Sequence, residues 1–345
     1  MLYSDEPWSL DYNTAHKIAK PPFPYVPGNE LSVVRHCPPP PPPSWSRVDL
    51  LREASREREQ VDVVTRCLRH PPSKGKLIPQ EALRLRILDT IRAEDGKTSQ
   101  LVSVCVISAG DSIIHRRDEI VAKFYDPLYY NHYLDDIDPF LCADREYTRE
   151  AAAYSRLSAF RITGIPEYYG SYSLEIPVAN TSRFVRLILI QKIDGIPMHK
   201  LSPHDLSLSQ RQAIMKGILD VESQIYKCDV RNHDIHPRNV IVQNVSSARP
   251  EIVIIDFGFT LFGRSYDPEG EPEEERAMLP GTYISPRVRW GVRNGRHLLV
   301  MNFKEWITWN WNAWLQSEYK DDEVTDYVRA HWRPESTDIW PSGCE

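Results

Sequence analysis

The sequence predicts an α+β protein of two lobes, with an antiparallel sheet in the first lobe and mainly helices in the second. Three stretches in series have the apolar patterning and the length typical of strands, at residues 83–88, 102–107 and 119–125. Their short connections favour an antiparallel meander. A helical stretch and two more strands follow, whereas the pattern after residue 206 is mainly helical. This order of elements is typical of the α+β class.

The composition excludes several classes of protein. The chain has 345 residues, enough for one large domain or two modest ones at about 150 residues per domain. Its net charge of −6 argues against non-specific binding to nucleic acids. The longest apolar runs, such as residues 252–255, are far too short to cross a bilayer. Asp5 and Glu6 interrupt the start of the chain, so we expect no secretory signal.

The cysteines predict neither a disulfide scaffold nor a metal site. The six cysteines include no Cys-x-x-Cys pair, and the eleven histidines include no His-Glu-x-x-His motif. Scattered cysteines of this kind are typical of free thiols in a reducing compartment. We therefore expect a cytoplasmic or nuclear protein that has neither a nucleic acid nor a membrane as its partner.

The N-terminal part is rich in proline, and we expect residues 1–46 to form an extension. Its six consecutive prolines, Pro38 to Pro43, favour a stiff polyproline II rod. A spacer is the interpretation we favour for this run, and a ligand for an SH3- or WW-type groove is the alternative. Residues 47–72 follow as a charged amphipathic helix, with Ser46 as its cap and Pro71 ending it.

The remaining elements divide the chain into a first lobe, residues 73–193, and a second lobe, residues 194–345. In the first lobe we expect, beyond the three strands above, a helix over residues 144–157 and strands over residues 168–173 and 184–191. In the second lobe we expect a helix over residues 207–229, begun by a capping box of Ser207 and Gln210, strands over residues 240–242 and 252–255, and one amphipathic, Trp-rich helix from Phe303 to Leu315.

Two short motifs carry the chemistry. Asp234 and Asn239 stand five residues apart, and Asp256 follows after two short apolar stretches, within the triplet Asp-Phe-Gly. Phosphoryl transfer needs an acid that accepts the proton of the attacking hydroxyl, together with oxygen ligands for Mg²⁺. The first motif can place one side chain at the nucleophile and one at a metal, and Asp256 supplies a further metal ligand.

This pair of motifs resembles the protein kinase-like superfamily. The resemblance covers roughly residues 76–290 and implies a two-lobed kinase-like fold with a reduced helical C-lobe, and ATP and Mg²⁺ as cofactors. The sequence from Val121 to Pro127 also resembles that of fungal kinase-like proteins. The segment after Asp234, with His236 and Pro237 before Asn239, is similar to choline- and aminoglycoside-kinase-type phosphotransferases.

The resemblance implies a role for each matching residue. Asp234 is implied as the catalytic base, and Asn239 and Asp256 as the ligands of Mg²⁺. Lys123 would hold the phosphates and Glu150, with Glu146 as the alternative, would orient Lys123. The nucleotide would also contact the turn between the first two strands and the segment after the fifth strand, through Gly96, Thr98, Ser99, Gln191 and Ile193.

Several departures from the family pattern leave two functions open. The turn that would close over the phosphates contains one glycine, Gly96, where the family has three. Asn232 stands in place of the usual histidine. In residues 281–287, which resemble the end of a kinase activation segment, Arg287 replaces the glutamate whose ion pair anchors that segment. The first function is a phosphotransferase that acts on a protein Ser/Thr or on a small-molecule hydroxyl. The second is a pseudokinase, a module that binds a nucleotide or a protein without catalysis.

Overall fold

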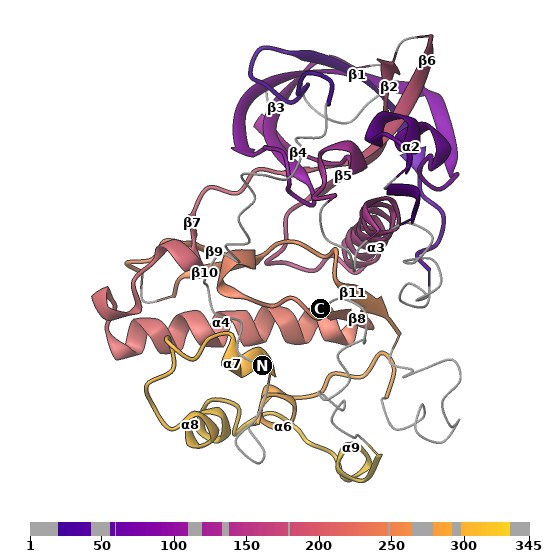
Figure 1. Cartoon of the computed structure of the whole chain (residues 1–345). Helices are drawn as coiled ribbons and strands as arrows, with labels where there is room; N and C mark the ends of the chain where they lie inside the picture. The colour runs from indigo at the N-terminus through magenta and orange to yellow at the C-terminus, as the bar shows by residue number, and fades with distance from the viewer. Residues whose placement is uncertain are drawn as a thin grey trace.

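The computed structural model describes residues 20–42, 56–58, 60–109, 119–132, 138–178, 180–247, 249–263, 279–291 and 298–331. They form a mixed α+β structure with a large antiparallel sheet, as the sequence predicts (Figure 1). The strands are β1 (Glu30–Cys37), β2 (Lys76–Arg92), β3 (Gln100–Ala109), β4 (Glu119–Tyr125), β5 (Tyr168–Val178), β6 (Thr181–Gln191), β7 (Ile196–Pro197), β8 (Val230–Asn232), β9 (Val240–Gln243), β10 (Glu251–Ile254) and β11 (Thr260–Phe262). The helices are α2 (Val63–Arg69), α3 (Pro139–Ala159), α4 (Leu208–Lys227), α6 (Pro286–Arg289), α7 (Leu298–Met301), α8 (Trp311–Glu318) and α9 (Asp326–His331).

The large sheet closes into a barrel with the strand order β1-β2-β3-β4-β6-β5, and β5 pairs with β1. Neighbouring strands are antiparallel throughout. Alternate residues of each strand fill the interior, because successive side chains of a strand point to opposite faces. The buried core of the barrel includes Val33, Leu83, Leu85, Ile87, Val102, Val104, Val106, Ala122, Phe124, Leu187 and Leu189.

The strand that completes the barrel, β1, lies inside the segment that the sequence analysis assigned to an extension. Val33 is fully buried, and Val34 pairs with Ala82 of β2 and with Ser173 of β5. The prolines on both sides of this strand concealed its alternation, since a proline-rich composition indicates an extended spacer. Residues 20–29 also pack on the barrel, where Tyr25 is fully buried and donates a hydrogen bond to Asp126 at 2.6 Å.

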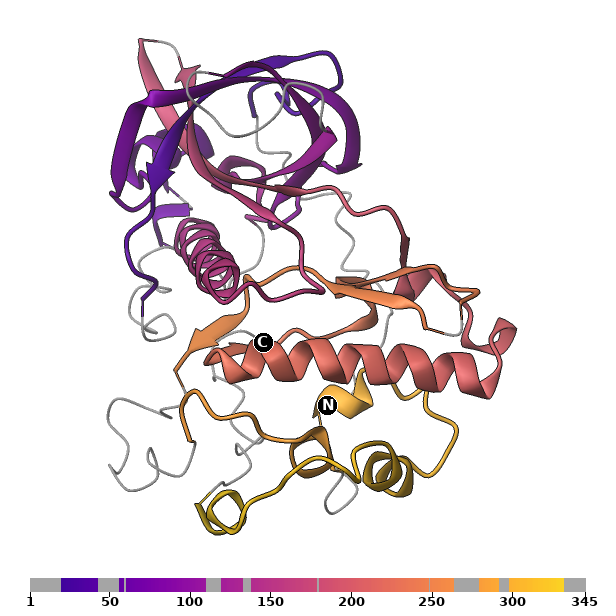
Figure 2. The same ribbon diagram turned by 180° about the vertical axis from the view of Figure 1, so that it is seen from behind.

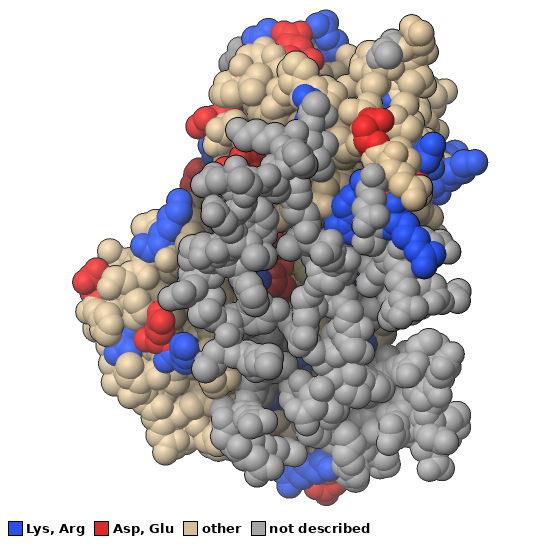
Figure 3. Space-filling view, viewed as in Figure 1, with Lys and Arg blue, Asp and Glu red and all other residues tan. Residues whose placement is uncertain are grey.

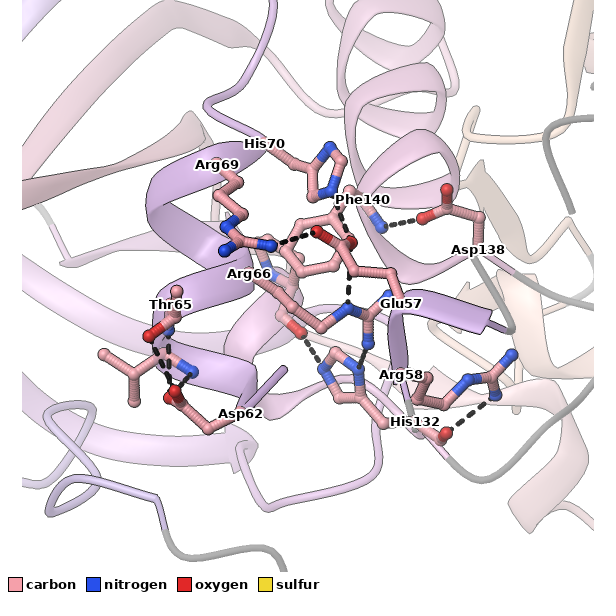
Figure 4. Close-up of polar contacts among 12 residues, drawn as sticks. Glu57, Arg58, Asp62, Thr65, Arg66, Arg69, His70, His132, Asp138 and Phe140 are labelled. Carbon is pink, nitrogen blue, oxygen red and sulfur yellow. Dashed lines mark hydrogen bonds and ion pairs between the residues drawn. The ribbon is translucent and has the colours of Figure 1, made fainter. Parts of the chain in front are cut away.

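The helix predicted over residues 47–72 is only partly described, because residues 47–55, and Ser46 as its cap, lie outside the described ranges. Residues 56–58 are helical, but residues 61 and 62 are not, so the predicted helix is interrupted there. α2 begins at Val63, after Asp62, whose side chain accepts hydrogen bonds from the first turn. Figure 4 shows how this region is held in place: Arg66 lies over the Phe140 ring and contacts Glu57 and His132.

His132 fixes the position of α2 as a neutral side chain. Its Nε2 donates to the carbonyl of Pro127 at 2.6 Å, so its Nδ1 accepts from Arg66, at 3.3 Å. Burial, together with nearby cations, lowers the pKa of His132 to about 4, although the Pro127 carbonyl opposes the shift.

Lys and Arg side chains gather beside this part of the barrel in the space-filling view (Figure 3).

Helix α3 lies between the barrel and the rest of the molecule (Figures 1 and 2). Asp138 caps it by accepting a hydrogen bond from Phe140 N at 2.9 Å, and Pro139 occupies its first turn. Because it runs from Pro139 to Ala159, α3 extends beyond both ends of the helix predicted over residues 144–157. Its fully buried residues Tyr147, Ala151 and Tyr154 belong to the core of the helical part.

The helical part is built around α4, which runs across the molecule below the barrel (Figure 2). Its predicted capping box is present: Ser207 accepts from Gln210 N, and Gln210 accepts from Ser207 N. Two small sheets, β10-β9-β7 and β11-β8, lie on one side of α4, between it and the barrel. The short helices α6, α7 and α8 lie on the other side.

The predicted single helix from Phe303 to Leu315 is wrong. Residues 302–306 form turns, and α8 begins only after Asn310, whose extended backbone and side-chain cap start a new helix. The predicted burial of the aromatic residues is confirmed, because Phe303, Trp306, Trp311 and Trp314 all lie in the core.

Two expectations from composition can be compared with the described residues. The five cysteines among them form no disulfide bonds with one another. Within the same ranges, no helix has both the length and the apolar character that a membrane span requires.

Candidate active site

Lys123 lies in the centre of a charged cluster on the outer face of the barrel. Its neighbours in β4, Ala122 and Phe124, belong to the barrel core, so Lys123 points the opposite way, toward α3. Its Nζ donates to Glu150 Oε2 at 2.6 Å and to Asp256 Oδ1 at 2.9 Å. Three predicted site residues from β4, α3 and the loop after β10 are therefore in contact.

One carboxylate oxygen of Glu150 accepts two hydrogen bonds, and the other accepts none within the described ranges. Its Oε2 accepts from the Tyr125 hydroxyl at 2.6 Å as well as from Lys123. Its Oε1 is buried, and no group in the described ranges donates to it. Tyr125 was missed by the sequence analysis, although it lies two residues after Lys123 and therefore on the same face of β4.

The charges of this cluster stabilise one another against the cost of burial. Burial disfavours the charged form of Lys123, but Asp256 and Glu150 outweigh this effect and raise its pKa. Burial also disfavours ionisation of Asp256, yet Lys123 and the N–H of Gly258 hold its pKa below the ordinary value. The pKa of Glu150 is raised by burial, and Lys123 opposes that shift.

A further carboxyl group of α3, Glu146, lies one helical turn before Glu150. Only 6% of it is exposed, and its Cγ would lie 3.4 Å from a Cβ at Gly258. Burial raises the pKa of Glu146 to about 8, and Asp256 adds to the shift while Lys123 opposes it. Lys123 makes its hydrogen bond to Glu150, so Glu146, the alternative partner predicted from the sequence, enters the cluster as a mainly protonated neighbour.

Asp256 follows β10 in a backbone conformation that few residues adopt. Its φ of 65° lies in the left-handed region, which is costly for a residue with a Cβ. Its main-chain oxygen accepts a hydrogen bond from Asn232 Nδ2 at 3.0 Å. Asn232 Oδ1 in turn accepts from Asp234 N at 2.9 Å, so Asn232 joins the two predicted motifs. From the sequence, Asn232 is only a departure from the family pattern, and this role could not be predicted there.

Asp234 lies in the loop after β8, with both carboxylate oxygens in contact with a donor. Asn239 Nδ2 donates to Asp234 Oδ2 at 2.8 Å, and Arg238 forms an ion pair with Asp234 Oδ1. The Asp234 side chain is 23% exposed and that of Arg238 is 51% exposed, so this part of the site is open to solvent. The structure therefore brings Asp234 and Asn239 together.

Asn239 directly precedes β9 and Asp256 follows β10, and both retain an oxygen that could bind a cation. Ile255 N donates to the main-chain oxygen of Asn239 at 2.9 Å, which brings the backbone next to Asp256 to Asn239. Within the described ranges, no hydrogen bond uses Asn239 Oδ1 or Asp256 Oδ2. Those ranges contain no group of three or more His, Cys, Asp or Glu residues that could hold a metal alone. One carboxylate and one amide oxygen fit Mg²⁺, which usually takes its other ligands from water and phosphates.

The turn between β2 and β3 contains the three residues predicted to hold the phosphates. The N–H of Gly96 donates to the carbonyl of Tyr129 at 2.8 Å, which ties the turn to the 3₁₀ helix Pro127–Tyr129. Thr98 is exposed, whereas Ser99 is buried and accepts a hydrogen bond from Arg92 at 3.1 Å. The amide of Gly96 is thus already used within the protein.

Gln191 and Ile193 line a cavity of about 470 Å³ at the connection between the barrel and the helical part. Gln191 is held there by Glu167, whose carbonyl accepts from Gln191 N at 2.9 Å. The other lining residues are Thr163, Gly164, Ile165, Lys192, Asp194, Val221, Gln243, Glu251, Ile252 and Val253. None of the charged residues around Lys123 or Asp234 lines this cavity, so the structure does not join the two groups of predicted residues in one pocket.

The segment of residues 279–291 is anchored in a way that the sequence analysis did not predict. Arg287 donates to the carbonyls of Lys320 and Asp322. Arg289 forms a buried bidentate ion pair with Glu222 of α4, at 2.6 and 2.8 Å. The pair of Arg289 and Glu222 therefore anchors the segment on α4, at a position other than Arg287.

Comparisons with known proteins add no family to this description. No protein-family model matches the chain, and no curated protein matches it. Any functional proposal therefore rests on the residues themselves, on their geometry and on the resemblance of their motifs.

Proposed function

We propose that this chain is an ATP- and Mg²⁺-dependent phosphotransferase with the two-lobed fold of the protein kinase-like superfamily. The observation that carries the proposal is the contact of Lys123 with both Glu150 and Asp256, across three elements far apart in the sequence. A buried lysine that contacts two carboxylates is costly to maintain unless its charge is used. The barrel with α3 corresponds to the N-lobe in this proposal, and the part around α4 corresponds to the C-lobe.

Each residue of the cluster has a role in this reaction. Lys123 binds the phosphates, Glu150 orients Lys123, and Asn239 and Asp256 hold Mg²⁺, which neutralises charge on the phosphates when bound. Asp234 accepts the proton of the acceptor hydroxyl. The hydroxyl oxygen bonds to the γ-phosphorus while the bond from that phosphorus to the β–γ bridging oxygen breaks and ADP leaves. The chain contributes positioning and charge, and no covalent intermediate is required.

The position of Asp234 supports its role as the base. Asn239 and Arg238 orient its carboxylate, and Asn232 fixes the backbone of Asp234 relative to Asp256. The side chain remains 23% exposed, so an acceptor can reach it. A protein Ser/Thr and a small-molecule hydroxyl are both compatible with this open position.

The alternative is a pseudokinase, which binds a nucleotide or a protein and transfers no phosphate. One observation favours it: the N–H of Gly96, the single glycine of the turn, is bound to the carbonyl of Tyr129. A turn with its amide occupied has less to offer a phosphate than a glycine-rich loop.

Substitution of Asp234 by Asn separates the two functions. We expect the wild-type protein to convert ATP to ADP in the presence of Mg²⁺, with water or the protein itself as acceptor. Asp234→Asn should lower this turnover about 100-fold or more, because it removes the base, and it should leave the Kd of Mg-ATP within about threefold. Asp205→Asn, at an exposed carboxylate away from the site, is the matched control.

Equal turnover in Asp234→Asn and in the wild type would reject Asp234 as the base. Binding of Mg-ATP by a wild-type protein that shows no turnover would reject the phosphotransferase and support the pseudokinase.

A further inference from the structure

Arg92 lies in the same row of the barrel as Lys123. It is the last residue of β2 and pairs with Leu101 of β3, and Leu101 pairs with Lys123 of β4. Residues that pair directly across neighbouring strands point to the same face of a sheet. Arg92 therefore points to the outer face from which Lys123 reaches Glu150 and Asp256.

The guanidinium of Arg92 is available to a ligand. Its single hydrogen bond within the described ranges goes to Ser99 Oγ, at 3.1 Å, and it forms no ion pair there. The residue is exposed, in contrast to Lys123.

Two main-chain donors of the turn after Arg92 are already used within the protein. The N–H of Glu94 donates to Gln100 Oε1 at 2.9 Å, and that of Gly96 donates to the carbonyl of Tyr129 at 2.8 Å. An arginine side chain can replace such amides, because its planar guanidinium forms two parallel hydrogen bonds with a phosphate.

We propose that Arg92 binds the phosphate tail of the nucleotide and does the work that the amides of a glycine-rich loop would otherwise do. This inference rests on the proposed nucleotide site and adds a residue to it: the phosphates lie between an exposed guanidinium at the end of β2 and the buried ammonium of Lys123. If Arg92 binds the phosphates, the amide of Gly96 is not needed for that purpose. Its hydrogen bond to Tyr129 then no longer favours a pseudokinase.

The test compares binding of Mg-ATP and of adenosine by the full chain and by Arg92→Gln, in calorimetric titrations at one fixed salt concentration. Arg92→Gln should weaken Mg-ATP binding about tenfold or more and change adenosine binding less than twofold, because adenosine has no phosphate. Arg92→Lys should recover part of the loss. Arg84→Gln is the matched control, since Arg84 also lies on β2 but its guanidinium pairs with Glu30.

The melting temperature of unliganded Arg92→Gln should equal that of the wild type, because the replaced side chain is exposed. Equal Mg-ATP affinity in Arg92→Gln and wild type would overturn the role of Arg92 and leave the proposed function standing. The same conclusion would follow if Arg92→Gln lost as much affinity for adenosine as for Mg-ATP. A wild-type protein that binds no Mg-ATP would overturn the proposed function and this inference with it.

Discussion

Two buried ion pairs of this protein, one at Asp126 and one at Lys123, differ in how completely their charges are matched. In the barrel, Arg183 donates to both oxygens of Asp126, at 2.6 and 2.9 Å, and the hydroxyl of Tyr25 and the N–H of Leu128 complete the shell. The carboxylate of Asp126 is fully buried. One positive charge meets one negative charge, and both carboxylate oxygens are satisfied.

The cluster at Lys123 is not balanced in this way. One ammonium faces the carboxyls of Glu150 and Asp256, and Glu146 lies beside them. Glu150 Oε1 is buried without a donor among the described residues, and Asp256 Oδ2 takes part in no hydrogen bond there. An excess of negative charge with unused oxygens favours the binding of a cation, whereas both oxygens of Asp126 already accept hydrogen bonds and offer no such site. The comparison indicates that the first pair holds the structure together and the second belongs to a site.

The largest expected effect comes from breaking the balanced pair. Asp126→Ala leaves Arg183 buried without its partner, and loss of one member of a buried pair costs about 3–5 kcal/mol. We expect the free energy of unfolding, measured by urea denaturation, to fall by that amount. At temperatures where the variant is folded, its affinity for Mg-ATP should match that of the wild type.

Glu30→Ala is the control for Asp126→Ala, because Glu30 also pairs with arginines but at an exposed position. Exposed pairs contribute about 1 kcal/mol or less. Equal effects of the two substitutions would contradict the structural role of Asp126, and loss of Mg-ATP binding in folded Asp126→Ala would contradict the division between the two pairs.

A pH-dependent effect is expected from Glu146, because its ionisation at rising pH adds a negative charge to the cluster. Its pKa is about 8 in the folded protein and near 4.5 in the unfolded chain, so the folded state retains a proton that the unfolded chain has lost between these values. The wild type should therefore lose stability as pH rises from about 4.5 through 8. Glu146→Gln carries no such proton, and its stability relative to wild type should increase over that window by up to about 5 kcal/mol, at about 1.4 kcal/mol per pKa unit.

The measurement is urea unfolding of both proteins at several pH values between 4.5 and 9. Glu318→Gln, at an exposed position of α8, provides the control. A difference between Glu146→Gln and wild type that does not vary with pH would show that Glu146 is not the proton-binding group of the cluster.

Much of the cluster could be predicted from the sequence because its residues lie in strongly patterned elements. Strand alternation places Lys123 on one face of β4, and the capped helix α4 and the short strands after Asp234 have clear boundaries. The mutual positions of Asn232, Tyr125 and Arg92 could not be predicted, because they depend on the register of strands and on loops whose conformation follows from tertiary contacts. The anchoring pair of Glu222 and Arg289 joins residues 67 positions apart and has no local signal.

The fold of the N-terminal part was the least predictable. Proline dominated the composition, and the alternation of β1 is interrupted at Val34 and Arg35, where its register with β2 shifts, although this strand closes the barrel. The prediction of one helix through Trp309 failed for a related reason. The apolar residues recur at helical spacing, but Asn310 caps a new helix, and local capping prevails over periodicity there.

The central claim is that the unbalanced cluster at Lys123 binds Mg-ATP, and the melting temperature with and without Mg-ATP tests it most directly. At a ligand concentration about 100 times the Kd, binding adds about 2.7 kcal/mol to the free energy of unfolding, or a few degrees in the melting temperature. We predict a shift that requires Mg²⁺ and is lost in Asp256→Ala, which lacks the metal ligand. No shift in the folded wild-type protein, or a shift of equal size in Asp256→Ala, would contradict the account.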